Sequence, residues 1–153
     1  MNDTVLSEAV LLAGGNGTRL KPFTHYTSKH LLPVGDVPMI TYPIKNLQLI
    51  GVDRLIIVIN PCHEDQWHNF LNNANFGVEI KVVMQQKALG IPQAISMCKP
   101  YLHTDNFYVA LGDNIILSSN FLNKFKKLAL KFPAVMSTFT TECPSEYGIA
   151  EFD

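Results

Sequence analysis

The sequence predicts an α/β fold built on a mostly parallel, doubly wound sheet. Short apolar runs without alternation, typical of strands buried on both faces, lie at residues 9–13, 54–60, 79–85 and 107–111. Stretches with apolar residues at helical spacing separate these runs. Strands that alternate with helices favour a Rossmann-like sheet, whose ligand lies beyond the carboxyl ends of the strands.

The predicted elements follow one another without a linker or an internal repeat. The first strand stops at two glycines. A helix follows because Ile40, Ile44 and Leu47 have helical spacing, and Gly51 stands where a left-handed C-terminal cap belongs. The remaining predicted helices span 63–71, 91–102 and 120–132, and two further predicted strands span 134–141 and 147–152.

Composition indicates a globular protein with a small-molecule ligand. The 153 residues fit one domain, residues 1–153, and 47% of them are hydrophobic, which is ample for a core. Only 16% are charged and the net charge is -1, so we expect neither nucleic acid nor a membrane surface as partner. The five histidines have no zinc-ligand spacing and are interpreted as surface or packing residues.

Targeting signals and disulfides are also not expected. No apolar run approaches the ~20 residues of a membrane span, and residues 1–8 lack the basic start and apolar centre of a signal peptide. Cys62, Cys98 and Cys143 are odd in number and far apart, which argues against a disulfide framework. These features predict a cytoplasmic protein.

The segment LAGGNGTRL, residues 12–20, predicts a loop that cradles phosphate after the first strand. Glycines allow positive φ and a close approach of backbone N–H groups to an anion, and the residues after them add a hydroxyl and cations. The residues concerned are Gly14, Gly15, Gly17, Thr18, Arg19 and Lys21, with Lys29 further along. The alternative is a tight turn with solvated charges, but glycines and cations together after a strand favour phosphate binding.

The spacing within this loop excludes two commoner phosphate loops. A P-loop requires Gly, four residues and then Gly-Lys-Ser/Thr, which the chain lacks. A dinucleotide fingerprint requires a third glycine where this chain has Leu20. A nicotinamide-dependent dehydrogenase is therefore not expected.

A long motif, LLAGGNGTRLKPFTHYTSKHLLPVGDVPMITYPIKNL, spans residues 11–47, and shorter motifs follow at Gln85, at 90–94, at 111–114 and at 147–153. In this order the motifs resemble the sugar-phosphate nucleotidyltransferases, in particular the glucose-1-phosphate thymidylyltransferases, over nearly the whole chain. The resemblance implies a nucleotidyltransferase-type fold, truncated relative to the family. It also implies nucleotidyl transfer from dTTP or UTP to a sugar-1-phosphate, for which glucose-1-phosphate is expected, with release of pyrophosphate.

The resemblance implies catalytic roles for three charged residues. The reaction needs no protein nucleophile, but it must align anionic groups, which calls for cations and a metal. Arg19 would grip the phosphates and stabilise the leaving pyrophosphate, and Lys29 would neutralise the sugar phosphate or the α-phosphate. Asp113, which follows the fourth strand, would hold Mg²⁺. An isolated Gly-Asp is otherwise typical of a turn.

Nucleotide recognition is predicted at the loop and at the end of the third strand. The Gln85 amide offers a donor and an acceptor, which match the O4 and N3–H edge of thymine or uracil, although Gln86 is an alternative and Gln85 could merely cap its strand. Leu89 and Pro92 depart from the family pattern, so a different base-loop geometry is expected. The full predicted nucleotide-binding set is Leu12, Ala13, Gly14, Gly15, Gly17, Thr18, Arg19, Gln85, Gly90 and Gly112.

Tyr147 and Gly148 match a pair that lies along the sugar in the family, although a tyrosine that opens an apolar strand is otherwise ordinary core. Family members are longer than this chain. Their later segments would supply a Glu-Lys pair for the sugar and a second aspartate for the metal, so we expect a homo-oligomer or a complementing chain. Three interpretations stay open: a fragment of an enzyme, a short enzyme completed by another chain, and a catalytically incomplete nucleotide-binding module.

Overall fold

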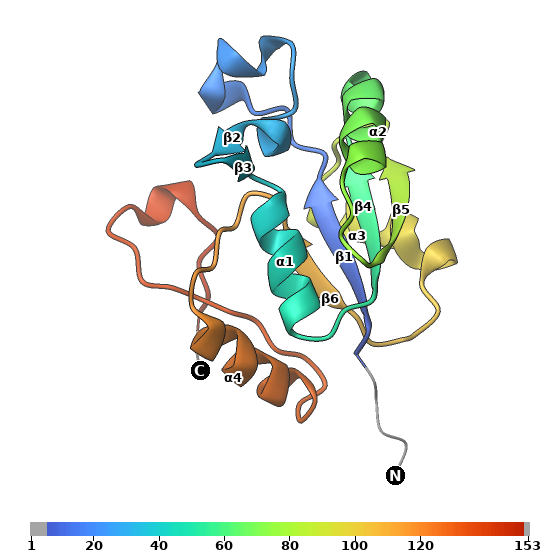
Figure 1. The fold of residues 1–153 in the computed structure, drawn as a ribbon. Coiled ribbons are helices and arrows are strands. Elements are labelled where there is room, and N and C mark those ends of the chain that lie inside the picture. The colour runs from blue at the N-terminus through green and yellow to red at the C-terminus, as the bar shows by residue number, and fades with distance from the viewer. Residues whose placement is uncertain (1–5, 152–153) are drawn as a thin grey trace.

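The computed structural model describes residues 6–151, and its central feature is a parallel sheet of four strands (Figure 1). The strand order β5-β4-β1-β6 places the first strand in the interior, with β4 on one side and β6 on the other. The strands are β1 (Glu8–Ala13), β4 (Arg54–Ile59), β5 (Glu79–Met84) and β6 (Tyr108–Leu111). The predicted α/β class and the mostly parallel sheet are therefore confirmed.

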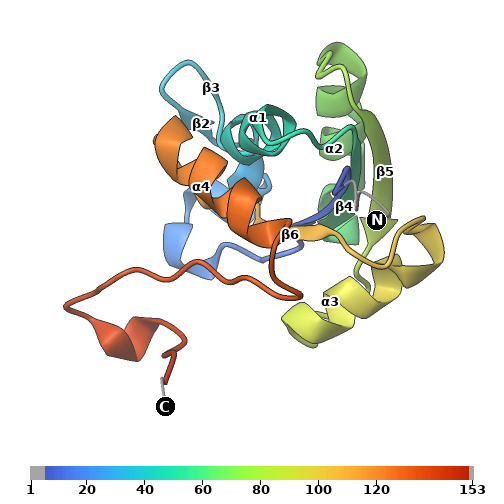
Figure 2. The ribbon, with the colours of Figure 1, turned by 90° about the horizontal axis from the view of Figure 1, so that it is seen from below.

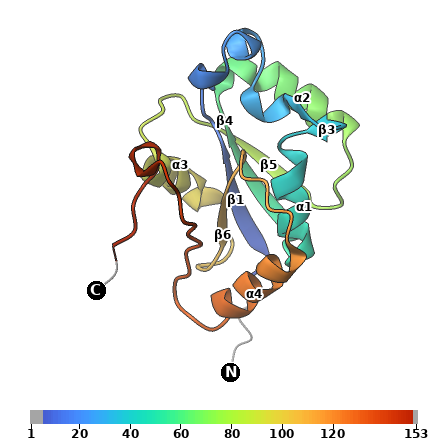
Figure 3. The same cartoon turned by 90° about the vertical axis from the view of Figure 1, so that its left-hand side faces the viewer.

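Helices cover both faces of this sheet. The helices are α1 (Thr41–Leu49), α2 (Glu64–Asn73), α3 (Ile91–Cys98) and α4 (Ser119–Ala129). Figures 2 and 3 show α1, α2 and α4 on one face and α3 on the other. A short hairpin, β2 (Pro33–Val34) with β3 (Val37–Pro38), precedes α1 and was not predicted. None of the helices in residues 6–151 has the length and apolar character of a membrane-spanning segment.

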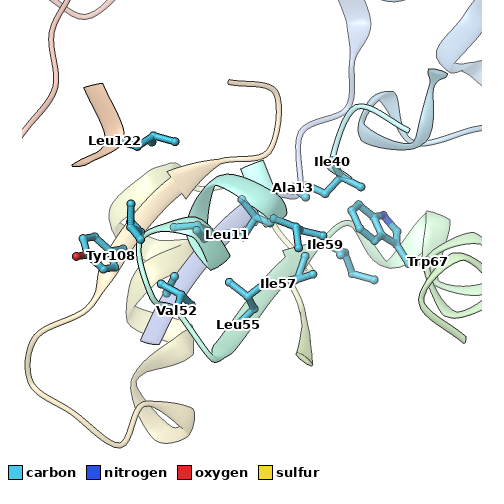
Figure 4. Close-up of a cluster of buried hydrophobic side chains, with 14 residues drawn as sticks. Leu11, Ala13, Ile40, Val52, Leu55, Ile57, Ile59, Trp67, Tyr108 and Leu122 are labelled. Atoms are coloured by element: carbon cyan, nitrogen blue, oxygen red, sulfur yellow. The ribbon is translucent and has the colours of Figure 1, made fainter. Parts of the chain in front are cut away.

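The core consists of two clusters, one on each face of the sheet. Leu11 and Ile57 point toward the α1 side, where they pack with Trp67 of α2 (Figure 4). Their neighbours Val10 and Ile56 point toward α3. Because successive side chains of a strand alternate between faces and both faces are covered, β1 and β4 require apolar residues at every interior position. That requirement explains the continuous apolar runs in the sequence.

Two helices end earlier than predicted. Helix α3 stops at Cys98 because Lys99–Tyr101 forms a tighter 3-10 turn, and Pro100 lacks the N–H that a continuing helix would need. Helix α4 begins after Ser118, whose Oγ accepts the Phe121 N–H at 3.2 Å as an N-terminal cap, and it ends at Ala129 rather than at residue 132.

The two predicted C-terminal strands are wrong. Residues 134–141 and 147–151 form no strand, and Phe152 lies outside the described residues. Met136 and Phe139 are exposed, and Figure 2 shows this segment outside the sheet and its helices. A strand exists only where a neighbouring backbone accepts and donates its hydrogen bonds, so apolar composition alone does not form one.

One polar side chain lies deep in the core near the carboxyl end of the sheet. His30 is 2% exposed, its ring centroid lies 6.3 Å from that of Trp67, and its Nδ1 lies 3.2 Å from Ser28 Oγ. Burial lowers the pKa of His30 to about 4, and the charge of the adjacent Lys29 acts in the same direction. The imidazole is therefore neutral in the folded protein at neutral pH.

We predict that acidification weakens the fold through His30. In the unfolded chain its pKa returns to the ordinary value of 6.5, so below pH 6.5 the unfolded state binds the proton that the folded state excludes. The stabilisation is thus present above pH 6.5 and is lost as pH falls toward 4. Between pH 7.5 and 5 the free energy of unfolding should fall by about 2 kcal/mol from this residue.

Urea unfolding of the wild type and of His30→Gln across this pH range measures the effect. The variant should show a flatter pH dependence, whereas His25→Gln, a change at an exposed histidine, should retain the wild-type slope. Equal slopes for the wild type and His30→Gln would contradict the assignment.

Candidate active site

The register of the sheet places four strand ends side by side. The last residues of β1, β4 and β5 are paired with one another, and the end of β6 is paired with the penultimate residue of β1. The next residues along the chain therefore emerge at one edge of the sheet; they are Gly14, Asn60, Gln85 and Gly112. The strand order reverses at β1, and such switch points are where open α/β sheets bind ligands.

The glycine-rich loop is held in place at two adjacent residues, Asn16 and Gly17. Asn60 Nδ2 donates to Asn16 Oδ1 at 2.6 Å, and Thr24 Oγ1 donates to the carbonyl oxygen of Gly17 at 2.7 Å. Gly17 has φ of +59°, and a Cβ there would lie 2.9 Å from Thr24 Cγ2. Both the conformation and the space thus require glycine. No pattern in the sequence indicated the Asn16–Asn60 contact.

Lys29 and Asp113 form an ion pair beside this loop. Lys29 Nζ lies 2.5 Å from Asp113 Oδ2, and Lys29 Cε lies 3.4 Å from where a Cβ of Gly15 would stand. Partial burial alone would raise the pKa of Asp113, but the hydrogen bond and the charge of Lys29 outweigh it and hold the pKa below its ordinary value. A cation and an ionised carboxylate therefore lie next to the backbone of the loop.

His30 lies beneath this ion pair and was interpreted from the sequence only as a surface or packing residue. A Cβ at Gly112 would lie 2.8 Å from His30 Cδ2 and 3.0 Å from the carbonyl oxygen of Leu12, so glycine lets β6 close against both. Lys29 directly precedes His30 in the sequence, and Asp113 directly follows Gly112. The packing of His30 against Gly112 thus brings the two charged residues together.

Arg19 extends from the loop into solvent. It belongs to the 3-10 turn Thr18–Leu20, and within residues 6–151 it makes no ion pair or side-chain hydrogen bond. Thr18 is exposed as well. A guanidinium in this position is available to an anionic ligand bound on the loop.

Three other predicted nucleotide-binding residues lie at the ends of β1 and β6. Ala13 and Gly112 are buried, and the Leu12 carbonyl already accepts the Gly112 N–H at 2.8 Å. The Gly112–Leu12 hydrogen bond joins the end of β6 to β1 beneath the loop, whereas Ala13 pairs with Ile59 of β4. These contacts help to place the loop.

Gln85 lies against the loop from the neighbouring strand end. Its Oε1 is 2.5 Å from where a Cβ of Gly14 would stand, so any other residue at this position would displace the amide from its place beside the loop. Gly90 has φ of +100°, and a Cβ there would meet Pro92 at 3.8 Å. The alternative base reader, Gln86, is exposed.

Tyr147 and Gly148, the predicted sugar residues, are not brought to this edge by any described contact. Tyr147 is 50% exposed, its ring packs edge-on against Phe139 with centroids 5.1 Å apart, and its N–H donates to the Pro144 carbonyl. Gly148 has open space around it. In the described part of the chain, these two residues therefore form no pocket together with the loop edge.

The residues present fit a hard divalent cation only when a ligand completes its shell. Within residues 6–151, no three His, Cys, Asp or Glu side chains form a metal-binding group. Asp113 is the carboxylate at this edge of the sheet, and Lys29 contacts one of its two oxygens. Mg²⁺ commonly combines one or two carboxylates with substrate phosphates and water, and this donor set suits that arrangement.

A separate open hollow of about 570 Å³ lies between α2 and β5. Its lining includes His68, Leu71, Phe76, Gly77 and Lys81, and it contains none of the predicted site residues. We regard the loop edge as the site because glycines, cations and a carboxylate converge there, whereas the lining of the hollow contains no carboxylate.

Known proteins resemble this chain in sequence. The glucose-1-phosphate thymidylyltransferase of Neisseria meningitidis is 33% identical over 148 residues, which are 95% of this chain and 51% of that protein. The enzyme of the same name from Xanthomonas campestris is 36% identical over 149 residues, again 95% of this chain and 50% of the other. The chain spans about half the length of the curated relatives it matches.

Solved structures resemble it in fold. A Bacillus anthracis protein assigned as a glucose-1-phosphate thymidylyltransferase, in complex with sucrose, has a TM-score of 0.70 at 36% identity, over 78% of this chain and 50% of its own. The inositol-1-phosphate CTP transferase from T. maritima has a TM-score of 0.65 at 30% identity, over 72% of this chain and 44% of its own. The model of the nucleotidyl transferase family matches residues 8–153, and the chain belongs to that family.

Proposed function

We propose that this chain binds a pyrimidine nucleoside triphosphate, dTTP or UTP, and that its nucleotidyl group passes to a sugar-1-phosphate, giving a nucleotide-sugar and pyrophosphate. The observation that carries the proposal is the Lys29–Asp113 pair, 2.5 Å apart, beside a glycine-rich loop at the switch point of the sheet. Relatives named glucose-1-phosphate thymidylyltransferase support glucose-1-phosphate as the acceptor.

The triphosphate would lie along the loop. Gly14, Gly15 and Gly17 let backbone N–H groups approach its oxygens, and the exposed Arg19 and Thr18 add a bidentate cation and a hydroxyl. By the resemblance to the family, Arg19 would stabilise the pyrophosphate that leaves. Because this guanidinium has no partner in the described residues, binding would not require it to break an ion pair.

The reaction is a displacement at the α-phosphorus. An oxygen of the sugar-1-phosphate forms a new bond to that phosphorus while the bond to the β-phosphate oxygen breaks, and the electron pair leaves with pyrophosphate. Lys29 neutralises the approaching anions, and Asp113 would hold Mg²⁺ together with phosphate oxygens. When bound, the metal would supply charge neutralisation and alignment of the triphosphate.

The base would lie at Gln85, whose amide faces the loop, with Gly90 leaving room beside it. The fold alone does not select the base, because a similar structure is named as a CTP transferase and other relatives are named as thymidylyltransferases. Tyr147 and Gly148 would face the sugar only in an assembly that closes this side. We therefore propose a homo-oligomer or a complementing chain. We also propose that the protein acts in the cytoplasm.

We predict Mg²⁺-dependent release of pyrophosphate from dTTP or UTP when glucose-1-phosphate is present. Asp113→Asn should abolish turnover because the metal loses its carboxylate. Arg19→Ala should slow it by about 100-fold or more, the usual effect of losing a preorganised charge at a reacting phosphate. Lys124→Ala, which removes one positive charge from an exposed position on α4, should leave the rate unchanged.

A coupled pyrophosphate assay at high protein concentration, so that any self-assembly is complete, measures these rates. Absence of pyrophosphate release by the wild type under these conditions would contradict the catalytic proposal.

A second function, a nucleotide-binding module that needs another chain for catalysis, is favoured by one observation. Among the described residues, Asp113 is the carboxylate beside the loop, and no described contact brings Tyr147 or Gly148 to it. This alternative predicts dTTP binding in calorimetry that Arg19→Ala weakens and that glucose-1-phosphate does not change. Tight binding of the sugar phosphate by the chain alone would count against it.

A further inference from the structure

Three side chains form a hydrogen-bonded relay that ends at the glycine-rich loop. Gln85 Nε2 donates to Gln93 Oε1 at 2.7 Å, and Gln93 Nε2 donates to Met97 Sδ at 2.9 Å. Gln93 and Met97 are four residues apart on α3 and so share one face of that helix. Buried Ala94 and Cys98 pack against the sheet and fix the rotation of α3. Two members of the relay therefore lie on a helix whose rotation is set by apolar packing.

The chemistry of Met97 sets the direction of the relay. A thioether sulfur accepts hydrogen bonds and has no hydrogen to donate, so the Gln93 amide must turn its NH₂ toward Met97. The Gln93 oxygen then faces Gln85, and of the two polar groups of the Gln85 amide only the NH₂ can donate to it. As a consequence, Gln85 Oε1 is directed toward the loop, where it lies 2.5 Å from the Cβ position of Gly14.

We infer that Gln93, oriented by Met97, is a positioning residue that selects uracil or thymine over cytosine by holding the oxygen of Gln85 toward the base. This inference rests on the proposed function. Uracil and thymine carry a hydrogen on N3, which an amide oxygen accepts. Cytosine presents an N3 lone pair, which would face the same oxygen without a hydrogen between them. Cytosine has its donor on the neighbouring N4 amino group instead, so a cytosine seated as uracil is would set its N3 lone pair against the fixed acceptor.

The size of the effect follows from the mismatched contact. An unsatisfied polar pair of this kind typically weakens binding by about 10- to 100-fold. The wild type should therefore bind UTP at least about 10-fold more tightly than CTP. UTP and CTP share ribose and triphosphate, so the ratio of their dissociation constants isolates the base. Loop contacts and net charge affect both nucleotides alike and cancel in this ratio.

Two substitutions at Gln93 separate the donor and acceptor roles. Gln93→Glu keeps oxygens that accept from Gln85, so the preference for UTP should remain. Gln93→Lys offers only N–H donors, which the Gln85 oxygen would accept, leaving the Gln85 NH₂ toward the base. This variant should lose the preference for UTP by about 10-fold or more, up to a preference for CTP.

Ser96→Lys is the matched control. It places the same charge at an exposed position on the same helix without touching the relay, and its ratio should equal that of the wild type. Met97→Leu removes the acceptor that orients Gln93, so it should reduce the UTP preference while keeping the apolar packing.

Calorimetric titration of each folded variant with UTP and with CTP in the presence of Mg²⁺ gives the ratios. A ratio for Gln93→Lys equal to that of Ser96→Lys would overturn the inference and leave the proposed function intact. Equal affinity of the wild type for UTP and CTP would also overturn it. A wild type that binds neither nucleotide would instead contradict the proposed function itself.

Discussion

Parallel pairing of β1 with β4 on one side and β6 on the other is the constraint on which the site depends. In this register β1, β4 and β5 end at paired residues, and β6 ends beside them. Every residue that follows a strand must then turn out at one edge. The loop at Gly14, the amide of Gln85 and the carboxylate of Asp113 come together because their strands end together, although long stretches of sequence separate them.

The apolar core and the polar edge are coupled through His30. Its ring packs near Trp67 on one side and against Gly112 on the other, and the residues next to these contacts carry the ion pair. Burial keeps the pKa of His30 low, so the imidazole packs as a neutral ring and adds no positive charge beneath Lys29. On the opposite face of the sheet, apolar packing also positions a polar side chain at the edge, because the packing of α3 directs Gln93 toward Gln85.

Local patterns in the sequence predicted most of the sheet, since continuous apolar runs reflect burial on both faces at Leu11 and Ile57. The loop was predictable because glycines and cations are adjacent there. The Lys29–Asp113 contact spans 84 positions, and neither composition nor spacing encodes it. Lone residues such as His30 and Gln93 carry no periodic pattern. The prediction of two C-terminal strands was wrong because a strand depends on a neighbouring strand that the local sequence does not reveal.

The central claim is that a metal–triphosphate complex binds at the loop edge, and paramagnetic broadening of amide NMR signals by Mn²⁺ with dTTP locates that complex directly. We expect the signals of Gly14, Gly15, Gly17 and Asp113 to broaden strongly, because these amides lie at the proposed phosphate and metal positions. Signals around the hollow between α2 and β5, such as that of Phe76, should remain sharp. Broadening centred on that hollow, with the loop signals unchanged, would contradict the account.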